Sequence, residues 1–137
     1  MTEEARRWSD DAQRDLQRAR SMFADEDWAG AAFYCQQAME KWMKALLASK
    51  GENAWGHELT RLTKRVAEAF RESLPASFHR AAKELERDYT AARYPDAWET
   101  GTSYEHYTKE MAEERISWAE QVAEFARSRL FPGTAKN

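Results

Sequence analysis

The sequence predicts an all-α protein, folded as an up-and-down bundle of about five helices. Apolar residues recur at three- and four-residue spacing along the chain, and no stretch alternates apolar with polar residues as a strand would. Gly and Pro are sparse, and each Pro falls where a helix should start or stop. We expect one domain over residues 1–131, followed by a frayed tail over residues 132–137.

The first two helices are expected over residues 2–24 and 28–50. The acidic turn at residues 25–27 should separate them, with Asp27 as the N-cap and Gly51 as the C-cap of the second helix. Small residues surround Gly30, and Gly lowers helix stability, so we expect another helix to approach closely there. The apolar face of the first helix contains Trp8, Ala12, Leu16, Ala19 and Phe23.

The remaining three helices follow two loops, at residues 51–57 and 96–101. The third helix carries apolar residues from Leu59 to Phe70. Pro75 suits the first turn of the fourth helix, and Pro95 should end that helix because it disfavours helical conformation in the residue before it. Thr102 and Glu105 have the spacing of a capping box and predict the start of the fifth helix.

Composition restricts the class of protein. Hydrophobic residues make up 42% of the chain, which is enough for one core, and the net charge of −3 disfavours non-specific binding of nucleic acid. The single cysteine, Cys35, lies in a helical apolar pattern and is expected to be a buried thiol. No segment resembles a signal peptide or a membrane helix, so we expect a cytoplasmic protein. The six Trp and five Tyr exceed what one small core needs, which favours a homodimer.

Two lysines on the second helix are candidates for contact with a phosphate or a protein partner. Lys41 and Lys44 lie on adjacent helix faces with Gln37 and Glu40, and Glu40 and Lys44 have the order of an i,i+4 ion pair. Helix charges more commonly form a solvated face, which is the alternative interpretation.

Further candidates lie at two helix ends. His57 precedes the third helix, where its ring can donate to an anion or cap the helix. Arg93 can satisfy carbonyls at the end of the fourth helix, or it can pair with Asp96 and present a fixed guanidinium to a phosphate, beside Tyr94. The histidines lack metal-ligand spacing and there is no Gly-rich phosphate loop, so no metal or cofactor is expected.

Three segments together resemble the HEPN family, named for higher eukaryotes and prokaryotes nucleotide-binding. They are residues 27–41 (DWAGAAFYCQQAMEK, followed by KALL at 44–47), residues 57–59 (HEL) and residues 92–96 (ARYPD), the last followed by a long final helix. The resemblance implies a helical bundle that is usually dimeric. It also implies one of two functions: a partner of a separate minimal nucleotidyltransferase, often in a toxin–antitoxin pair, or a metal-independent ribonuclease.

The ribonuclease branch of the family carries an Arg followed, after four to six intervening residues, by a His. No Arg in this chain has that spacing to a His. Our leading hypothesis is therefore a non-catalytic HEPN module that binds a nucleotide or a minimal nucleotidyltransferase through Lys41, Lys44, His57, Arg93, Tyr94 and Asp96. A ribonuclease toxin that uses Arg93 and His57 from different helices is the enzymatic alternative. A helical scaffold for protein interaction is a third hypothesis, although no internal repeat supports it.

Overall fold

A computed structural model describes residues 1–133 of the chain. The fold of this part is helical throughout, which confirms the predicted fold class. Its elements are α1 Glu3–Ala24, α2 Trp28–Ser49, α3 Leu59–Phe70, α4 Ala76–Ala91, the 3₁₀ turns η1 Pro95–Ala97 and η2 Tyr104–His106, and α5 Lys109–Leu130. Most of the tail that we expected over residues 132–137 lies outside the described residues. None of the described helices is long and apolar enough to cross a membrane.

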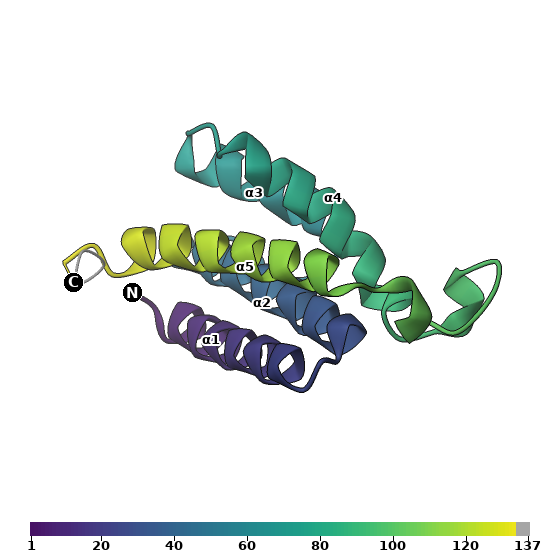
Figure 1. The fold of residues 1–137 in the computed structure, drawn as a ribbon. Coiled ribbons are helices and arrows are strands. Elements are labelled where there is room, and N and C mark those ends of the chain that lie inside the picture. Colours follow the sequence, from purple (N-terminus) through teal and green to yellow (C-terminus); the bar gives the residue numbers. More distant parts are fainter. Residues whose placement is uncertain (134–137) are drawn as a thin grey trace.

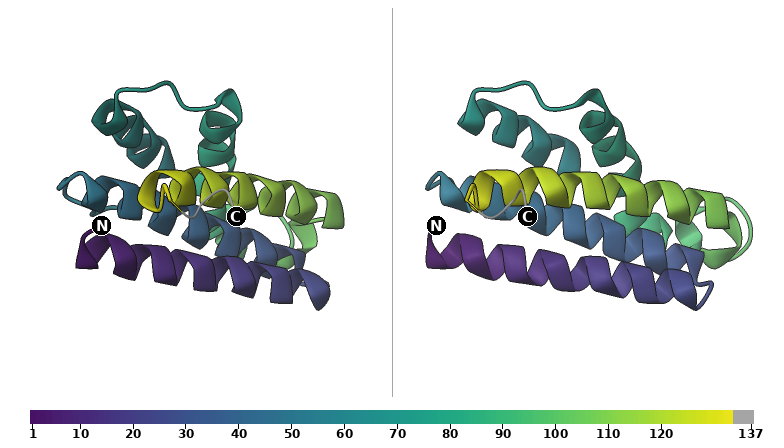
Figure 2. Two further views of the ribbon diagram at one scale, coloured as in Figure 1. Left: turned by 90° about the vertical axis from the view of Figure 1, so that its left-hand side faces the viewer. Right: turned by 60° about the vertical axis from the view of Figure 1, so that its left-hand side comes forward.

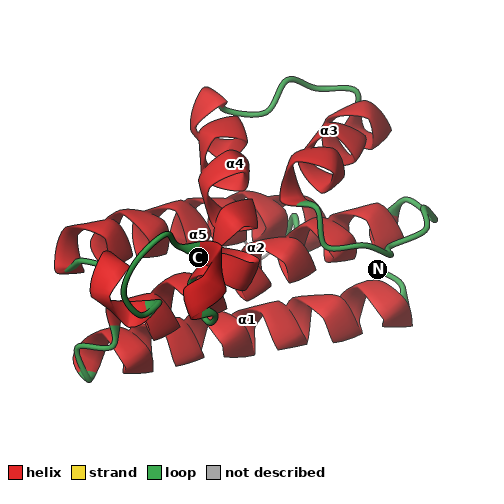
Figure 3. Cartoon of the chain, turned by 90° about the vertical axis from the view of Figure 1, so that its right-hand side faces the viewer, coloured by secondary structure: helices red, strands yellow, loops and turns green. Residues whose placement is uncertain are grey.

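Helix α2 is the centre of the molecule, in contact with each of the other four α-helices. Figure 1 shows α1, α2 and α5 lying side by side, with α1 antiparallel to α2. The views in Figures 2 and 3 show that α3 and α4 form a hairpin that crosses this layer on one side of α2. The long connection from α4 to α5, which contains both 3₁₀ turns, lies at the end of the bundle where α2 begins.

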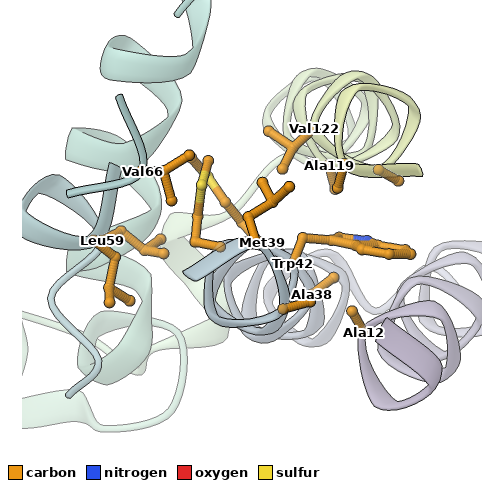
Figure 4. Packing of buried hydrophobic residues seen from close by; sticks show 14 of the residues in the cluster. Ala12, Ala38, Met39, Trp42, Leu59, Val66, Ala119 and Val122 are labelled. Carbon is orange, nitrogen blue, oxygen red and sulfur yellow. The ribbon is translucent and has the colours of Figure 1, made fainter. Parts of the chain in front are cut away.

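The core is built around α2, because apolar side chains surround that helix on almost every side. Alanines at heptad spacing, Ala5, Ala12 and Ala19 of α1, are fully buried, and small side chains allow two helices to approach closely. Figure 4 shows Ala12 of α1 beside Ala38 of α2, with the ring of Trp42 extending between α1 and α5. Burying a side chain the size of Trp42, which is 1% exposed, is among the larger contributions to the stability of such a bundle.

The predicted N-cap of α2 is confirmed, whereas its C-cap is Lys50, one residue before the predicted Gly51. The Asp27 carboxylate accepts a hydrogen bond from the backbone N–H of Gly30 at 2.8 Å. At the other end, Gly51 has a positive φ of 72°, and two backbone bonds close the helix: Gly51 N–H donates to the Ala48 carbonyl and Glu52 N–H to the Leu47 carbonyl. This is the Schellman arrangement that glycine favours.

The explanation that we gave for Gly30 is wrong. A β-carbon at this position would meet the Asp27 carboxylate first, with Oδ2 only 2.5 Å away, rather than another helix. Gly30 therefore leaves room for the cap of its own helix. The backbone N–H of Gly30 donates to the Asp27 carboxylate, and a β-carbon at position 30 would displace that same carboxylate. Gly30 and the Asp27 cap therefore depend on each other.

The start of the fifth helix was also predicted wrongly. The expected capping box at Thr102 and Glu105 does not begin it; Thr108 is the N-cap, and its hydroxyl accepts from the Met111 N–H at 3.2 Å. Tyr107 keeps an extended backbone, and its hydroxyl donates to the buried Asp88 carboxylate at 2.6 Å. This buried contact outweighs the local capping pattern. Pro75 is likewise one position earlier than expected, as the N-cap of α4.

Candidate functional site

The last turn of α4 carries a cluster of aromatic and basic side chains at the surface. Tyr89 is its centre: the ring of His57 stacks on the Tyr89 ring, with centroids 4.4 Å apart and planes 9° apart. The guanidinium carbon of Arg93 lies 4.8 Å from the same ring centroid. Phe33 of α2 and Tyr94 complete the group, which we call the Tyr89 cluster. It joins α2, α4 and the loop before α3.

The guanidinium of Arg93, two residues beyond the end of α4, is held in place by the last turn of that helix. Its Nε and Nη2 atoms both donate to the Tyr89 carbonyl, at 2.8 and 2.5 Å. Its carbon also lies 4.6 Å from the Phe33 ring centroid and 5.0 Å from that of Tyr94, within the range of cation–π attraction. The Nη1 group has no hydrogen-bonding partner among residues 1–133, and Arg93 is exposed. The helix end therefore presents an oriented cation to solvent.

Asp96 does not orient this guanidinium, contrary to our second interpretation. It is exposed and forms no ion pair with any part of the chain that the structure describes. The first interpretation is the correct one, since Arg93 satisfies the carbonyl of Tyr89 in the last turn of α4.

The loop that carries His57 is fixed to α4 by a carboxylate. Glu86 Oε1 accepts from the backbone N–H of Thr60 at 2.9 Å and from its hydroxyl at 2.7 Å. These bonds cap the N-terminus of α3 from outside, whereas the N-cap residue Glu58 makes no side-chain capping bond. Because Glu86 supplies the cap, the His57 ring does not cap the helix and is free to lie on Tyr89.

Lys41 and Lys44 are not brought to the Tyr89 cluster, and their face of α2 is not solvated. Lys41 Nζ pairs with two carboxylates of α1, Asp15 at 2.7 Å and Asp11 at 3.1 Å. Lys44, which is 7% exposed, forms the expected pair with Glu40 at 2.9 Å. Lys41 therefore joins α2 to α1, whereas Lys44 pairs within α2 and lies 4.8 Å from the ring centroid of Trp8 in α1. Both lysines are left out of the site proposed below.

A buried polar group holds α4 at Asp88, the residue before Tyr89. The Asp88 carboxylate accepts from the Tyr107 hydroxyl and from Arg115 Nε, each at 2.6 Å. Burial raises the pKa of the Asp88 carboxyl above its ordinary value, an effect that the nearby Arg115 guanidinium partly offsets. Burial also raises the pKa of the Tyr107 phenol. These contacts join α4, α5 and the connection between them next to Tyr89.

The connection between α4 and α5 is held by a second aromatic group. Trp98 Nε1 donates to the Ala91 carbonyl at 2.8 Å, and the Trp98 ring stacks on His106 with centroids 4.0 Å apart. A ring nitrogen of His106 lies 2.6 Å from the Thr100 carbonyl oxygen. The segment that carries Tyr94 is therefore anchored at both ends.

Comparison with known proteins decides the family. The model of the HEPN domain family matches residues 5–129 of this chain. The chain belongs to the HEPN family. Its fold is similar to that of TT1696 from Thermus thermophilus, with 34% identity, a TM-score of 0.87, and coverage of 93% of this chain and 99% of that one.

Two other solved structures, both of HEPN proteins, are also similar. For ST0689, an archaeal HEPN homologue, the identity is 30% and the TM-score 0.77, with 94% of this chain and 99% of that chain covered. For an HEPN domain protein, TM0613 of Thermotoga maritima, the identity is 27% and the TM-score 0.72, with 90% and 97% covered. No curated protein matches the sequence.

The HEPN fold brings together two residues that the sequence left apart. His57 and Arg93 come from different elements and contact the same ring. Tyr89 was not among the predicted site residues, because it follows Leu85 by four positions and such spacing is typical of the apolar face of a helix. Arg93 follows Tyr89 by four residues, a helical spacing that places both on one face and was the available signal.

Cys35 takes no part in the Tyr89 cluster. It is fully buried, as the sequence predicted, and burial raises the pKa of its thiol, which disfavours the nucleophilic thiolate. Among residues 1–133, no group of three or more His, Cys, Asp or Glu side chains is placed to hold a metal ion.

Proposed function

We propose that this protein is a non-catalytic HEPN module that binds a nucleotide at the Tyr89 cluster. In this proposal Arg93 contacts a phosphate, and the exposed rings of His57 and Tyr94 offer apolar faces to the base. The observation that carries the proposal is the Arg93 guanidinium, fixed among three rings with its Nη1 group unpaired among the described residues. A held, planar cation suits phosphate recognition because little side-chain freedom is lost on binding.

The surroundings of His57 favour binding over catalysis. Across residues 1–133, no side chain or carbonyl forms a hydrogen bond with its ring, so nothing described sets a tautomer for proton transfer. Two of the guanidinium nitrogens of Arg93 donate to a backbone carbonyl. Fewer N–H groups therefore remain to stabilise the charge that develops on a phosphoryl group during cleavage.

One observation favours the ribonuclease as a second candidate. His57 and Arg93 both contact Tyr89, so a general acid or base and a cation lie in one surface cluster. Purified protein incubated with structured and single-stranded RNA in the presence of a chelator separates the two candidates. RNA cleavage abolished by Arg93→Ala or by His57→Ala would replace the binding module with the enzyme.

Nucleotide binding itself is tested by calorimetric titration of AMP and ATP. Arg93→Ala should weaken binding by roughly 1.5–3 kcal/mol, which is the range for hydrogen bonds to charged groups. Arg93→Lys should recover only part of the lost affinity, since an ammonium group lacks the planar set of N–H donors of a guanidinium. Arg87→Ala is the matched control, because it removes another exposed guanidinium, from α4 itself. Arg87 Nη1 lies 3.5 Å from Glu84 Oε2. Equal weakening by Arg87→Ala would contradict the assignment.

We propose in addition that the module forms a homodimer. We also propose that it is the partner of a minimal nucleotidyltransferase, with which it forms a toxin–antitoxin pair. This part rests on membership of the family. The aromatic side chains support it less than the sequence indicated, because only Trp55, Tyr94 and Tyr104 are exposed among the Trp, Tyr and Phe residues that the structure describes. Co-purification with the product of a neighbouring nucleotidyltransferase gene tests the partnership, and separate elution of the two proteins would contradict it.

A further inference from the structure

A small hollow lies beside the loop that leads into α3. Its volume is about 180 Å³, and it is lined by Trp55, Gly56, Glu58, Arg61, Leu62 and Arg65. Leu62 of the hydrophobic core forms part of its wall, and the hollow shares no residue with the Tyr89 cluster. It combines an indole ring with two guanidinium groups.

Trp55 is the most exposed large hydrophobic side chain in the described part of the protein, at 68%. The remaining tryptophans are buried or half-buried, which is the usual state of so large an apolar ring. An exposed indole is a ready surface for stacking of a nucleobase, since every base has a flat face and stacking needs no particular sequence.

The charges that line the hollow are mainly positive. Arg61 forms no ion pair with any described residue, and Arg65 donates one hydrogen bond to the Asn53 carbonyl at 2.5 Å, which fixes its side chain. Glu58 is the one carboxylate in the lining. The two guanidinium groups outweigh it, so the hollow is locally cationic on a chain with a net charge of −3. Such a site attracts a phosphate without making the whole protein basic.

The hollow is a neighbour of the Tyr89 cluster along the chain. Only Gly56 separates Trp55 from His57, so their Cα atoms are at most about 7 Å apart. Each of the two places combines a stacking ring with a guanidinium group. One ligand made of linked nucleotides can therefore reach both, whereas a mononucleotide can occupy one at a time.

We infer that the hollow is a second nucleotide subsite and that the ligand of this protein is a single-stranded nucleic acid. One base stacks on Trp55 with its phosphate at Arg61, and the adjacent nucleotide occupies the Tyr89 cluster. The inference rests on the proposed nucleotide-binding function and extends it from a mononucleotide to a strand. A duplex does not fit the arrangement, because paired bases keep their faces stacked on one another and leave none for Trp55.

The test compares a strand with a mononucleotide. Fluorescence anisotropy measures the binding of labelled hexaadenylate RNA, and calorimetry measures the binding of AMP. Trp55→Ala should weaken hexaadenylate binding about 5- to 100-fold, the loss expected from one base stack. Arg61→Gln should also weaken it and should lower the dependence of affinity on salt by about 0.7 in logarithmic slope. Matched controls are Tyr104→Ala, which removes a ring that is 67% exposed, and Arg14→Gln, which removes an exposed cation of α1.

The outcomes distinguish this inference from the proposed function. Hexaadenylate that binds more tightly than AMP, and loses that advantage in Trp55→Ala and Arg61→Gln but not in the controls, supports the second subsite. Hexaadenylate that binds no more tightly than AMP, or tighter binding of an RNA duplex of equal length, overturns the inference and leaves the nucleotide site at Arg93 standing. Failure of both AMP and hexaadenylate to bind overturns the two proposals together.

Discussion

Replacing Arg115 with methionine should destabilise the fold strongly, and more so as the pH rises. Arg115 is 5% exposed and Asp88 is 3% exposed, and their side chains approach to 2.6 Å. Removing one member of a buried ion pair typically costs about 3–5 kcal/mol, because the remaining charge stays away from water. The Tyr107 hydroxyl would still donate to Asp88, so we expect the lower end, about 3 kcal/mol at neutral pH.

The pH dependence follows from the Asp88 carboxyl. Burial already raises its pKa, and Arg115 acts against that rise, so removing Arg115 raises the pKa further. A carboxyl with a higher pKa in the folded than in the unfolded state binds a proton more readily when folded. The stability that it contributes is full at low pH and is lost as the pH rises through the folded-state pKa. The cost of Arg115→Met should therefore be smaller at pH 5 than at pH 8.

Urea unfolding followed by tryptophan fluorescence measures this cost at both pH values. Arg80→Met is the control, because the Arg80 side chain is 72% exposed and lies 3.7 Å from Glu114, and its loss should change stability by less than about 0.5 kcal/mol. A second variant, Arg115→Met with Asp88→Leu, removes both charges and should recover much of the loss. A cost below about 1 kcal/mol at pH 8, or equal costs at pH 5 and pH 8, would refute this account of the buried pair.

Three further predictions concern a helix cap, the loop before α3 and assembly. Gly30→Ala should change stability little in the parent, because loss of the Asp27 cap, about 0.5–2 kcal/mol, offsets the gain of about 1 kcal/mol in helix propensity. The same change in an Asp27→Ala background should stabilise, and equal effects in both backgrounds, measured by thermal unfolding, would show that Gly30 and Asp27 are not coupled. Glu86→Ala should cost about 0.5–2 kcal/mol through the lost cap at Thr60 and should speed amide exchange in the loop before α3, so unchanged exchange would contradict that role. Light scattering at micromolar concentration should give twice the chain mass of 16.0 kDa, whereas the mass of one chain would exclude the homodimer.

Local signals in the sequence predicted much of the fold. The spacing of apolar residues placed four of the helices to within a few residues, and Asp27 and Gly51 marked both ends of α2. These features are local, because a helix and its caps depend on residues within a few positions of one another. The start of α5 was predicted wrongly because it depends on a contact between residues far apart in the sequence. The Tyr107 hydroxyl donates to Asp88, and this bond holds Tyr107 outside the helix.

The candidate site was predicted less completely. His57, Arg93 and Tyr94 were singled out and do lie together, but Lys41 and Lys44 bind carboxylates within the bundle, and Asp96 forms no pair with Arg93. Spacing along one helix shows which residues share a face, but it does not show what that face meets. The acidic partners of Lys41 lie on α1, a separate helix, so sequence distance gave no sign of the pairing.

The sequence by itself determined a helical bundle, most of its helix ends, and a resemblance to the HEPN family that the family comparison then confirmed. Only the tertiary structure decided that His57 lies on Tyr89, that Arg115 pairs with Asp88, and that Trp55 lines one hollow with two arginines of α3. The physical reason is that each of these contacts joins side chains from different elements. Whether they meet depends on how each helix is rotated about its axis and how the helices cross, and the packing of the whole core sets both.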